Sequence, residues 1–396
     1  MKELSASAQA VRASTTIAID SLYKKMKAEG YDVIGFGAGE PDFNTPDHIK
    51  EAGINAIRSN QTRYTPAAGT ERLRAAVCKR LEQDCGLFYE PSQIVAASGA
   101  KHNVFAALMA LLNPGDEVIL PAPYWVSYYE MIRMAGGVPV VVNAPEAEEF
   151  KLSPAAMEAA VTSKTKAIIL NNPSNPTGML YDRAALTAIG EICLKHDLYV
   201  IADEIYYSLI YDGNSFVSFP SLSPELKEHT ILINGVSKTY AMTGWRVGYA
   251  AANPRIARVM ANYLSHSTSA PSTISQAAAA AALEGPQDSI EEMRRQFEAR
   301  RDYMMERISK IRGVSCIKPQ GAFYAMMNIE PLLGRVISGT LMEDADSFAS
   351  AFLEKGLVAV VPCTGFGAPH HIRWSYATSM ENIKEGMDRL ERFLLG

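Results

Sequence analysis

The sequence is poor in cysteine and has no long hydrophobic run. Its 396 residues include five cysteines, an odd number, and no two of them form a C-x-x-C pair. This pattern excludes a disulfide scaffold and is typical of reduced thiols, so we expect a cytoplasmic protein. The longest apolar runs have the length of strands, and the stretch after Met1 lacks the apolar core of a signal peptide. We therefore expect no membrane anchor.

No charge of one sign dominates either. Lysine and arginine number 38 against 43 aspartates and glutamates, which gives a formal net charge of −5, and the charges are dispersed. A nucleic acid or an anionic membrane surface would require a basic patch, so we expect neither as a partner. Chemistry on a small molecule is the remaining expectation.

Several familiar site motifs are also missing. The sequence contains no G-x-x-x-x-G-K-[ST], no H-E-x-x-H and no G-x-S-x-G. The stretch Gly35–Glu40 imitates a dinucleotide fingerprint, but its third glycine falls one place early and Pro41 stands where a helix should begin. His370 and His371 have no further ligands at metal spacing, so we predict no metal site.

The middle of the chain alternates helical patterns with short runs rich in valine and isoleucine. This alternation predicts an α/β fold, in which a mainly parallel seven-stranded sheet is sandwiched by helices. The seven runs are Gln93–Ser98, Glu117–Leu120, Val138–Val142, Lys166–Leu170, Leu198–Ala202, Thr230–Ile233 and Val247–Ala251.

The pattern of predicted helices and strands changes near residue 290. A charged helix over residues 289–311 leads into fewer strands, at Ala322–Met327, Leu357–Val361 and His371–Tyr376, which indicates a smaller α+β domain. We expect residues 1–44 to form an N-terminal arm and part of the small domain, 45–288 the large domain, and 289–396 the small C-terminal domain.

Polar residues follow the predicted strands, and in a parallel sheet ligands bind beyond the carboxyl ends of the strands. The first strand ends in Gly99-Ala100-Lys101 before a helix, whose free N–H groups suit a phosphate. Taken alone, this is equally well a plain turn. Trp125 follows the second strand and offers a flat face for a planar ring, although a tryptophan beside prolines also simply packs.

Three further strands end in the same way. Asn171–Gly178 presents amide side chains or is only a turn. Asp203 closes an apolar strand, where a carboxylate needs a cationic partner or several donors. Lys238 and Arg246 follow the sixth strand and singly are equally well surface charges. Five such features on one sheet edge favour a ligand site over coincidence.

In this order the residues resemble the class I aminotransferases of the aspartate aminotransferase family, specifically the bacterial branch with prephenate and aromatic aminotransferases. The resemblance runs nearly end to end, through Gly37–Phe43, Tyr64–Pro66 with Gly69, Pro123–Trp125, Asn172–Gly178, Asp203–Tyr206, Ser237–Arg246 and Arg373–Ala377. It implies an aspartate aminotransferase-like fold, pyridoxal 5′-phosphate as cofactor, and a homodimer with shared active sites.

The resemblance also implies individual roles around the cofactor ring. Lys238 would form the Schiff base and carry the proton from the substrate Cα, and Asp203 would pair with the pyridine nitrogen. Trp125 would stack on the ring, while Asn175 and Tyr206 would hydrogen-bond its phenolate oxygen.

The remaining roles concern the two anionic ends. The phosphate would be held by Arg246, by Gly99, Ala100 and Lys101, by Tyr64 of the partner subunit and by Ser237, although Gly235 stands where several relatives carry a phosphate-binding serine. Arg373 would bind the substrate α-carboxylate, and the backbone of Gly39 would close over that carboxylate. Lys101 is also a candidate for the distal carboxylate, because no counterpart of the arginine used by animal enzymes is evident.

We therefore predict transamination between an amino acid and a 2-oxo acid, with aspartate and 2-oxoglutarate as the leading pair. Aromatic, prephenate and alanine specificities stay open. So does a pyridoxal-phosphate C–S lyase, because the cofactor residues alone do not fix which Cα bond breaks. A non-catalytic ligand sensor is a third alternative, but such sensors usually carry a DNA-binding extension, for which we expect no room in this sequence.

Overall fold

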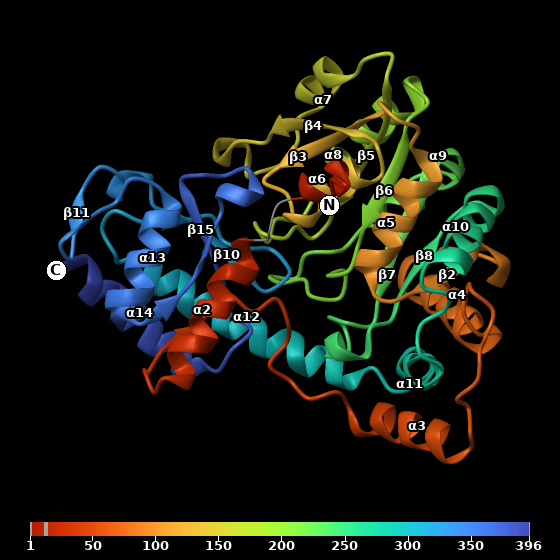
Figure 1. Cartoon of the computed structure of the whole chain (residues 1–396), viewed down its shortest axis with the longest axis horizontal. Helices are drawn as coiled ribbons and strands as arrows, with labels where there is room; N and C mark the ends of the chain where they lie inside the picture. Colours follow the sequence, from red (N-terminus) through yellow and green to blue (C-terminus); the bar gives the residue numbers. More distant parts are fainter. Residues whose placement is uncertain (1, 12–14, 396) are drawn as a thin grey trace.

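The computed structural model describes residues 2–11 and 15–395, and its main element is a seven-stranded sheet (Figure 1). The strand order is β2-β8-β7-β6-β5-β3-β4. The strands are β2 (Ile94–Ala97), β3 (Glu117–Ala122), β4 (Val138–Asn143), β5 (Thr165–Asn171), β6 (Tyr199–Asp203), β7 (Thr230–Gly235) and β8 (Gly248–Ala251). Neighbours pair in parallel except β8, which is antiparallel to β2 and β7. The α/β fold predicted from the sequence is confirmed.

Helices cover both faces of this sheet because successive strand residues point to opposite sides. On one face Val95 and Ile201 belong to a buried cluster with α5 (Ala100–Leu111), α6 (Ser127–Met134) and α10 (Pro254–Ser267). On the other face, Ile94 packs with α4 (Glu71–Cys85) and α11 (Thr273–Glu284), against which α3 (Asp47–Arg58) lies. Val200 packs there with α7 (Pro154–Ala160), α8 (Arg183–Lys195) and α9 (Pro224–His229).

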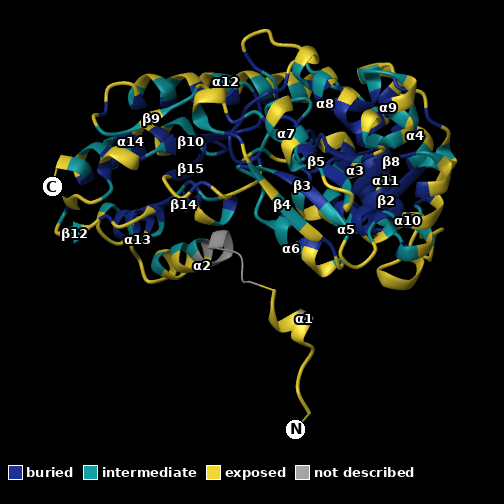
Figure 2. Ribbon diagram, turned by 90° about the horizontal axis from the view of Figure 1, so that it is seen from above, coloured by how far each residue is buried: buried dark blue, intermediate teal, exposed yellow. Residues whose placement is uncertain are grey.

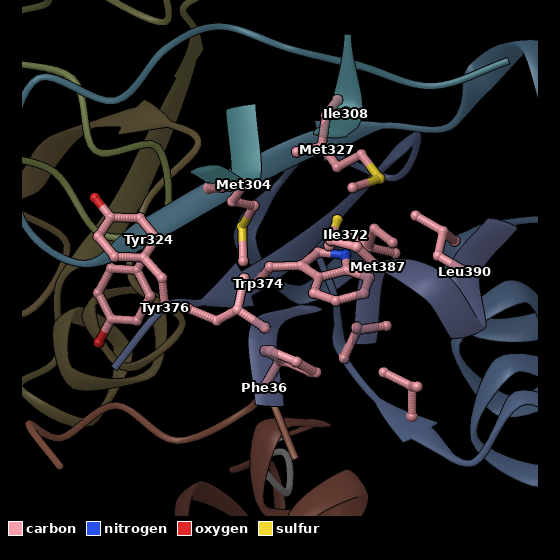
Figure 3. Packing of buried hydrophobic residues seen from close by; sticks show 14 of the residues in the cluster. Phe36, Met304, Ile308, Tyr324, Met327, Ile372, Trp374, Tyr376, Met387 and Leu390 are labelled. Atoms are coloured by element: carbon pink, nitrogen blue, oxygen red, sulfur yellow. The ribbon is translucent and has the colours of Figure 1, made fainter. Parts of the chain in front are cut away.

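The small domain packs three helices around a four-stranded sheet of order β14-β15-β10-β9. These strands are β9 (Ser315–Cys316), β10 (Tyr324–Asn328), β14 (Val361–Pro362) and β15 (His371–Ser375), and a hairpin of β11 (Val336–Ile337) and β12 (Thr340–Leu341) lies apart. The helices are α12 (Asp288–Ile308), α13 (Ala345–Gly356) and α14 (Met380–Leu395). Their core is aromatic, with Phe36 and Trp374 ring centroids 4.7 Å apart (Figure 3).

The N-terminal segment packs on the small domain. Strand β1 (Ile34–Gly35) pairs in parallel with β13 (Val358–Ala359), Asp32 forms an ion pair of 2.5 Å with Arg389, and α2 (Thr15–Ala28) lies beside β13 and β14. Helix α1 (Ala6–Gln9) stands away from the body of the molecule (Figure 2). We propose the division into residues 1–44, 45–288 and 289–396, and these contacts support it.

The strand predicted at Leu357–Val361 is wrong as a single strand. Leu357 is the C-terminal cap of α13 with φ 56°, β13 pairs with β1, and β14 pairs antiparallel with β15. The chain thus passes from one sheet to the other at Val360. All of Val358–Val361 is buried, so the apolar run gives no sign of the change.

Within residues 2–11 and 15–395, every helix is too short or too polar to cross a membrane, and no group of three or more His, Cys, Asp or Glu side chains could hold a metal ion. The five cysteines are all free thiols.

Candidate active site

A cavity of about 610 Å³ lies between the carboxyl ends of the central strands and the small-domain strands β10 and β15. Most residues that the sequence singled out line it: Gly39, Ala100, Lys101, Trp125, Asn175, Asp203, Tyr206, Ser237, Lys238, Arg246 and Arg373. Gly99 and Tyr64 are not among the lining residues. The polar residues that follow the predicted strands therefore lie around one cavity.

Lys238 provides an amine at this cavity, in the loop that joins β7 to β8. Its Nζ donates to the backbone carbonyl of Gly39. Burial lowers the pKa of Lys238 to about 8, and the positive charges of Arg246 and Arg373 act in the same direction, while Glu40 and Asp203 oppose them. Roughly a tenth of the amine is therefore uncharged and nucleophilic at pH 7, and this fraction rises steeply above neutrality.

Asp203 ends β6 with its carboxylate almost fully buried. Tyr128 Oη donates to Asp203 Oδ2 at 2.6 Å, and the backbone N–H of Ile205 donates to Oδ1 at 3.2 Å. Burial raises the pKa of Asp203 to about 6, and these two hydrogen bonds and the charge of Lys238 oppose the rise.

Sequence analysis missed Tyr128. Its ring lies edge-on to Trp125 with centroids 5.2 Å apart. The only available signal was its spacing, since a residue three positions after Trp125 lies on the same side of a helical turn.

One end of the cavity is built by the turn before α5. Gly99 has φ 88°, and a Cβ there would lie 2.5 Å from Nη2 of Arg246, so glycine allows the guanidinium to pack on the turn. Arg246 donates to the carbonyls of Ser98 at 3.2 Å and Thr243 at 3.0 Å. The Lys101 ammonium lies 4.9 Å from the centre of the Trp125 ring, and burial together with Arg246 lowers its pKa.

Arg373 builds the other end. It is 4% exposed, its Nη1 donates to Asn175 Oδ1 and its Nη2 to the carbonyl of Gly37, both at 2.9 Å, and its Nε has no partner. No carboxylate among the described residues forms an ion pair with it. Burying a guanidinium without a counter-charge has a high desolvation free energy. This end of the cavity therefore favours an anionic ligand.

Two side chains complete the region between these ends. The Tyr206 hydroxyl lies 2.9 Å from that of Tyr324, a residue the sequence analysis did not single out. Asn171 Oδ1 accepts from the backbone N–H of Asn175 at 2.7 Å and so orients that turn.

The two remaining candidates differ in location. Ser237 is buried at the cavity wall, whereas the Tyr64 side chain is fully exposed, outside the cavity of its own chain.

The charges of the cavity are unbalanced. Its lining includes the cations Lys24, Lys101, Lys238, Arg246 and Arg373 but only the carboxylates Glu40 and Asp203. The electrostatic potential of the cavity therefore favours a negatively charged ligand. An arginine at each end can bind one anionic group, so the cavity favours a ligand with two such groups.

Comparison with known proteins assigns this arrangement to a family. The sequence model of the class I and II aminotransferases matches residues 31–390, so the chain belongs to this family and is a transferase of nitrogenous groups. The family and enzyme class predicted from the sequence are thereby confirmed.

The relatives within that family have consistent names. The chain is 48% identical over 381 residues to an aspartate aminotransferase of Geobacillus stearothermophilus, covering 96% of each chain. It is 44% identical to an aspartate/prephenate aminotransferase of Cereibacter sphaeroides, covering 98% of this chain and 97% of the relative.

Solved structures agree. The aspartate aminotransferase from Rhizobium meliloti superposes with a TM-score of 0.96 at 40% identity, covering 100% of this chain and 99% of the other. The Thermus thermophilus aspartate aminotransferase with maleate gives 0.94 at 39% identity, with 100% of both chains covered.

Proposed function

We propose that the protein is an aspartate aminotransferase that uses pyridoxal 5′-phosphate and exchanges the amino group of aspartate with 2-oxoglutarate. The observation that carries this proposal is Arg373, a buried guanidinium with an unpartnered Nε and no carboxylate in ion-pair contact among the described residues. A carboxylate bound there would supply the missing counter-charge. The names of the relatives favour aspartate as the substrate.

The residues fit this cofactor group by group. An aldehyde requires an amine, which is Lys238, and a protonated pyridine nitrogen requires a buried carboxylate, which is Asp203. The phosphate would be held by Arg246 and the turn Gly99–Lys101, with Ser237 as a further donor. Trp125 would cover the ring, and Asn175 and Tyr206 would donate to its phenolate oxygen.

Each side chain then has a defined task. When bound, the cofactor supplies the conjugated system that takes up the electrons of the broken Cα–H bond. Arg373 and the Gly39 loop hold the α-carboxylate, so that the Cα proton is directed at Lys238 Nζ, which accepts it as the general base. Asp203 stays ionised because Tyr128 donates to it.

We further propose a cytoplasmic homodimer with shared sites. Tyr64 supports sharing, because a fully exposed tyrosine outside the cavity of its own chain is free to reach a neighbouring one. Its phenol would then donate to the phosphate from across the interface.

A single-turnover experiment tests the reaction. The purified holoenzyme is mixed with aspartate, glutamate, alanine or phenylalanine in the absence of any 2-oxo acid. Aspartate should yield one equivalent of oxaloacetate per site and no ammonia, because the amino group stays with the enzyme until 2-oxoglutarate takes it. With cystathionine added to the panel, release of homocysteine, pyruvate and ammonia from that thioether would instead indicate a C–S lyase. Preference for phenylalanine would indicate an aromatic aminotransferase.

A further inference from the structure

Tyr324 occupies a junction between the two domains. It begins β10 in the small-domain sheet, where it pairs in register with Ser375, and its side chain is 1% exposed. In Figure 3 its ring lies at the edge of the buried aromatic cluster, with the hydroxyl pointing away from Trp374. Tyr324 also lines the cavity. Its side chain is therefore in contact with both the small-domain core and the candidate active site.

The hydroxyl end of Tyr324 contacts the large domain. Its oxygen lies 2.9 Å from the Tyr206 hydroxyl, in the turn that follows β6, and the two rings are nearly perpendicular at 84°. A phenol donates only one proton. If Tyr324 donates to Tyr206, the proton of Tyr206 is left to point into the cavity.

The ring of Tyr324 contacts a different group. The guanidinium carbon of Arg373 lies 4.4 Å from the ring centre. The Arg373 Nε has no hydrogen-bond partner, so the plane of the guanidinium is oriented by the Asn175 side chain and the Gly37 carbonyl. Two rings also face it, Tyr324 and, at a larger centroid distance of 5.3 Å, Phe366. A desolvated cation over a tyrosine face is strongly oriented.

We infer that Tyr324 is a positioning residue that acts on both halves of the site, through its hydroxyl on Tyr206 and through its ring on Arg373. This inference rests on the proposed function, because it assigns Tyr206 to the cofactor and Arg373 to the substrate carboxylate. It predicts that the two effects can be separated by substitution.

Tyr324→Phe removes the hydroxyl and keeps the ring. With Tyr206 a weaker donor, the holoenzyme should need a higher pH to reach its high-pH absorption spectrum, so the spectroscopic pKa rises. Its affinity for maleate, a dicarboxylate that undergoes no transamination, should stay within about two-fold of the parent. Tyr324→Leu removes both parts, so it should show the same spectral shift and bind maleate about 30-fold more weakly.

Two comparisons make the test decisive. Tyr376 is a second buried tyrosine of the same cluster, but its hydroxyl donates to the Ala322 carbonyl at 3.4 Å and it does not line the cavity. Tyr376→Phe should change neither readout. Tyr206→Phe should reproduce the spectral shift, and adding Tyr324→Phe to it should produce little further shift, because both act through one hydrogen bond.

The inference is overturned if Tyr324→Phe leaves the spectroscopic pKa unchanged, or if it weakens maleate binding as much as Tyr324→Leu does. Tyr324→Phe preserves the packed ring, so the spectral arm stands even if the leucine variant unfolds. Failure of the proposed function is a distinct result, since the parent protein would then show no pyridoxal-phosphate absorption band at all.

Discussion

The hydroxyl of Tyr128 donates a 2.6 Å hydrogen bond to Oδ2 of Asp203, and both groups are buried. Burial alone favours the neutral carboxylic acid, whereas a donor favours the carboxylate. The pKa of Asp203, about 6, is the outcome of this opposition. Tyr128 therefore keeps Asp203 ionised at neutral pH.

Tyr128→Phe should move the acidic limb of the activity profile to higher pH. Asp203 is active as the carboxylate, so activity is lost as pH falls through its pKa, and a higher pKa brings that loss closer to neutrality. A hydrogen bond to a charged group contributes roughly 1.5–3 kcal/mol, so the limb should move by about one to two pH units. The measurement is kcat/KM against pH, with Tyr129→Phe as the neighbouring control. An unshifted limb with a uniformly lower rate would assign Tyr128 a purely structural role.

Lys238 should govern how the cofactor-free protein captures pyridoxal phosphate. Only the uncharged amine attacks an aldehyde, so the capture rate should rise with pH through about 8 and level off above it. Stopped-flow absorbance measures this rate. Lys238→Ala should abolish both the absorption band and borohydride fixation of the cofactor. Lys50→Ala, which removes a surface lysine paired with Asp47 at 2.5 Å, should change neither. Fixation at another lysine in the Lys238 variant would contradict the assignment.

Lys101→Ala should distinguish dicarboxylic from other substrates. If the ammonium over Trp125 binds the distal carboxylate, its loss should lower kcat/KM for aspartate and glutamate by about ten- to a hundred-fold and spare alanine and phenylalanine. Steady-state kinetics on the four amino acids provide the measurement. An equal loss for all four would assign Lys101 to the phosphate, since every substrate shares the cofactor.

Tyr64 should act across a subunit interface. Tyr64→Ala and Lys238→Ala chains should each be severely impaired, and mixing them should restore part of the activity, because a hybrid dimer contains one site with neither substitution. Activity is followed against time while subunit exchange is monitored by mass spectrometry. Exchange without recovery would count against a shared site. Mixing Asp203→Asn with Lys238→Ala is the matched control, and it should restore nothing, because both residues line the cavity of the same chain.

Much of the site was predictable because its polar groups interrupt apolar strands. Asp203 and Lys238 follow buried runs, where a charge requires a specific reason. Tyr128 and Tyr324 were missed for the converse reason. Each is a buried tyrosine in a segment that is otherwise part of the hydrophobic core, so its sequence context does not distinguish it from a packing residue. Its role becomes visible only from the hydrogen-bond partner of its hydroxyl. The change of sheet at Val360 was missed because both sheets bury the run equally.

The two ends of the cavity differ in the sequence separation of the residues that form them. Lys238 and Arg246 share the loop between the antiparallel strands β7 and β8, so they come together when that one hairpin pairs. Arg373, in contrast, bonds to Gly37, 336 residues earlier in the chain. A contact between such distant segments has a larger loop-closure entropy cost than the hairpin has. It also cannot form until the C-terminal strands have been synthesised. During synthesis, the cofactor end should therefore assemble on a chain whose α-carboxylate site is still incomplete, and binding of the substrate α-carboxylate is the last property that the nascent protein acquires.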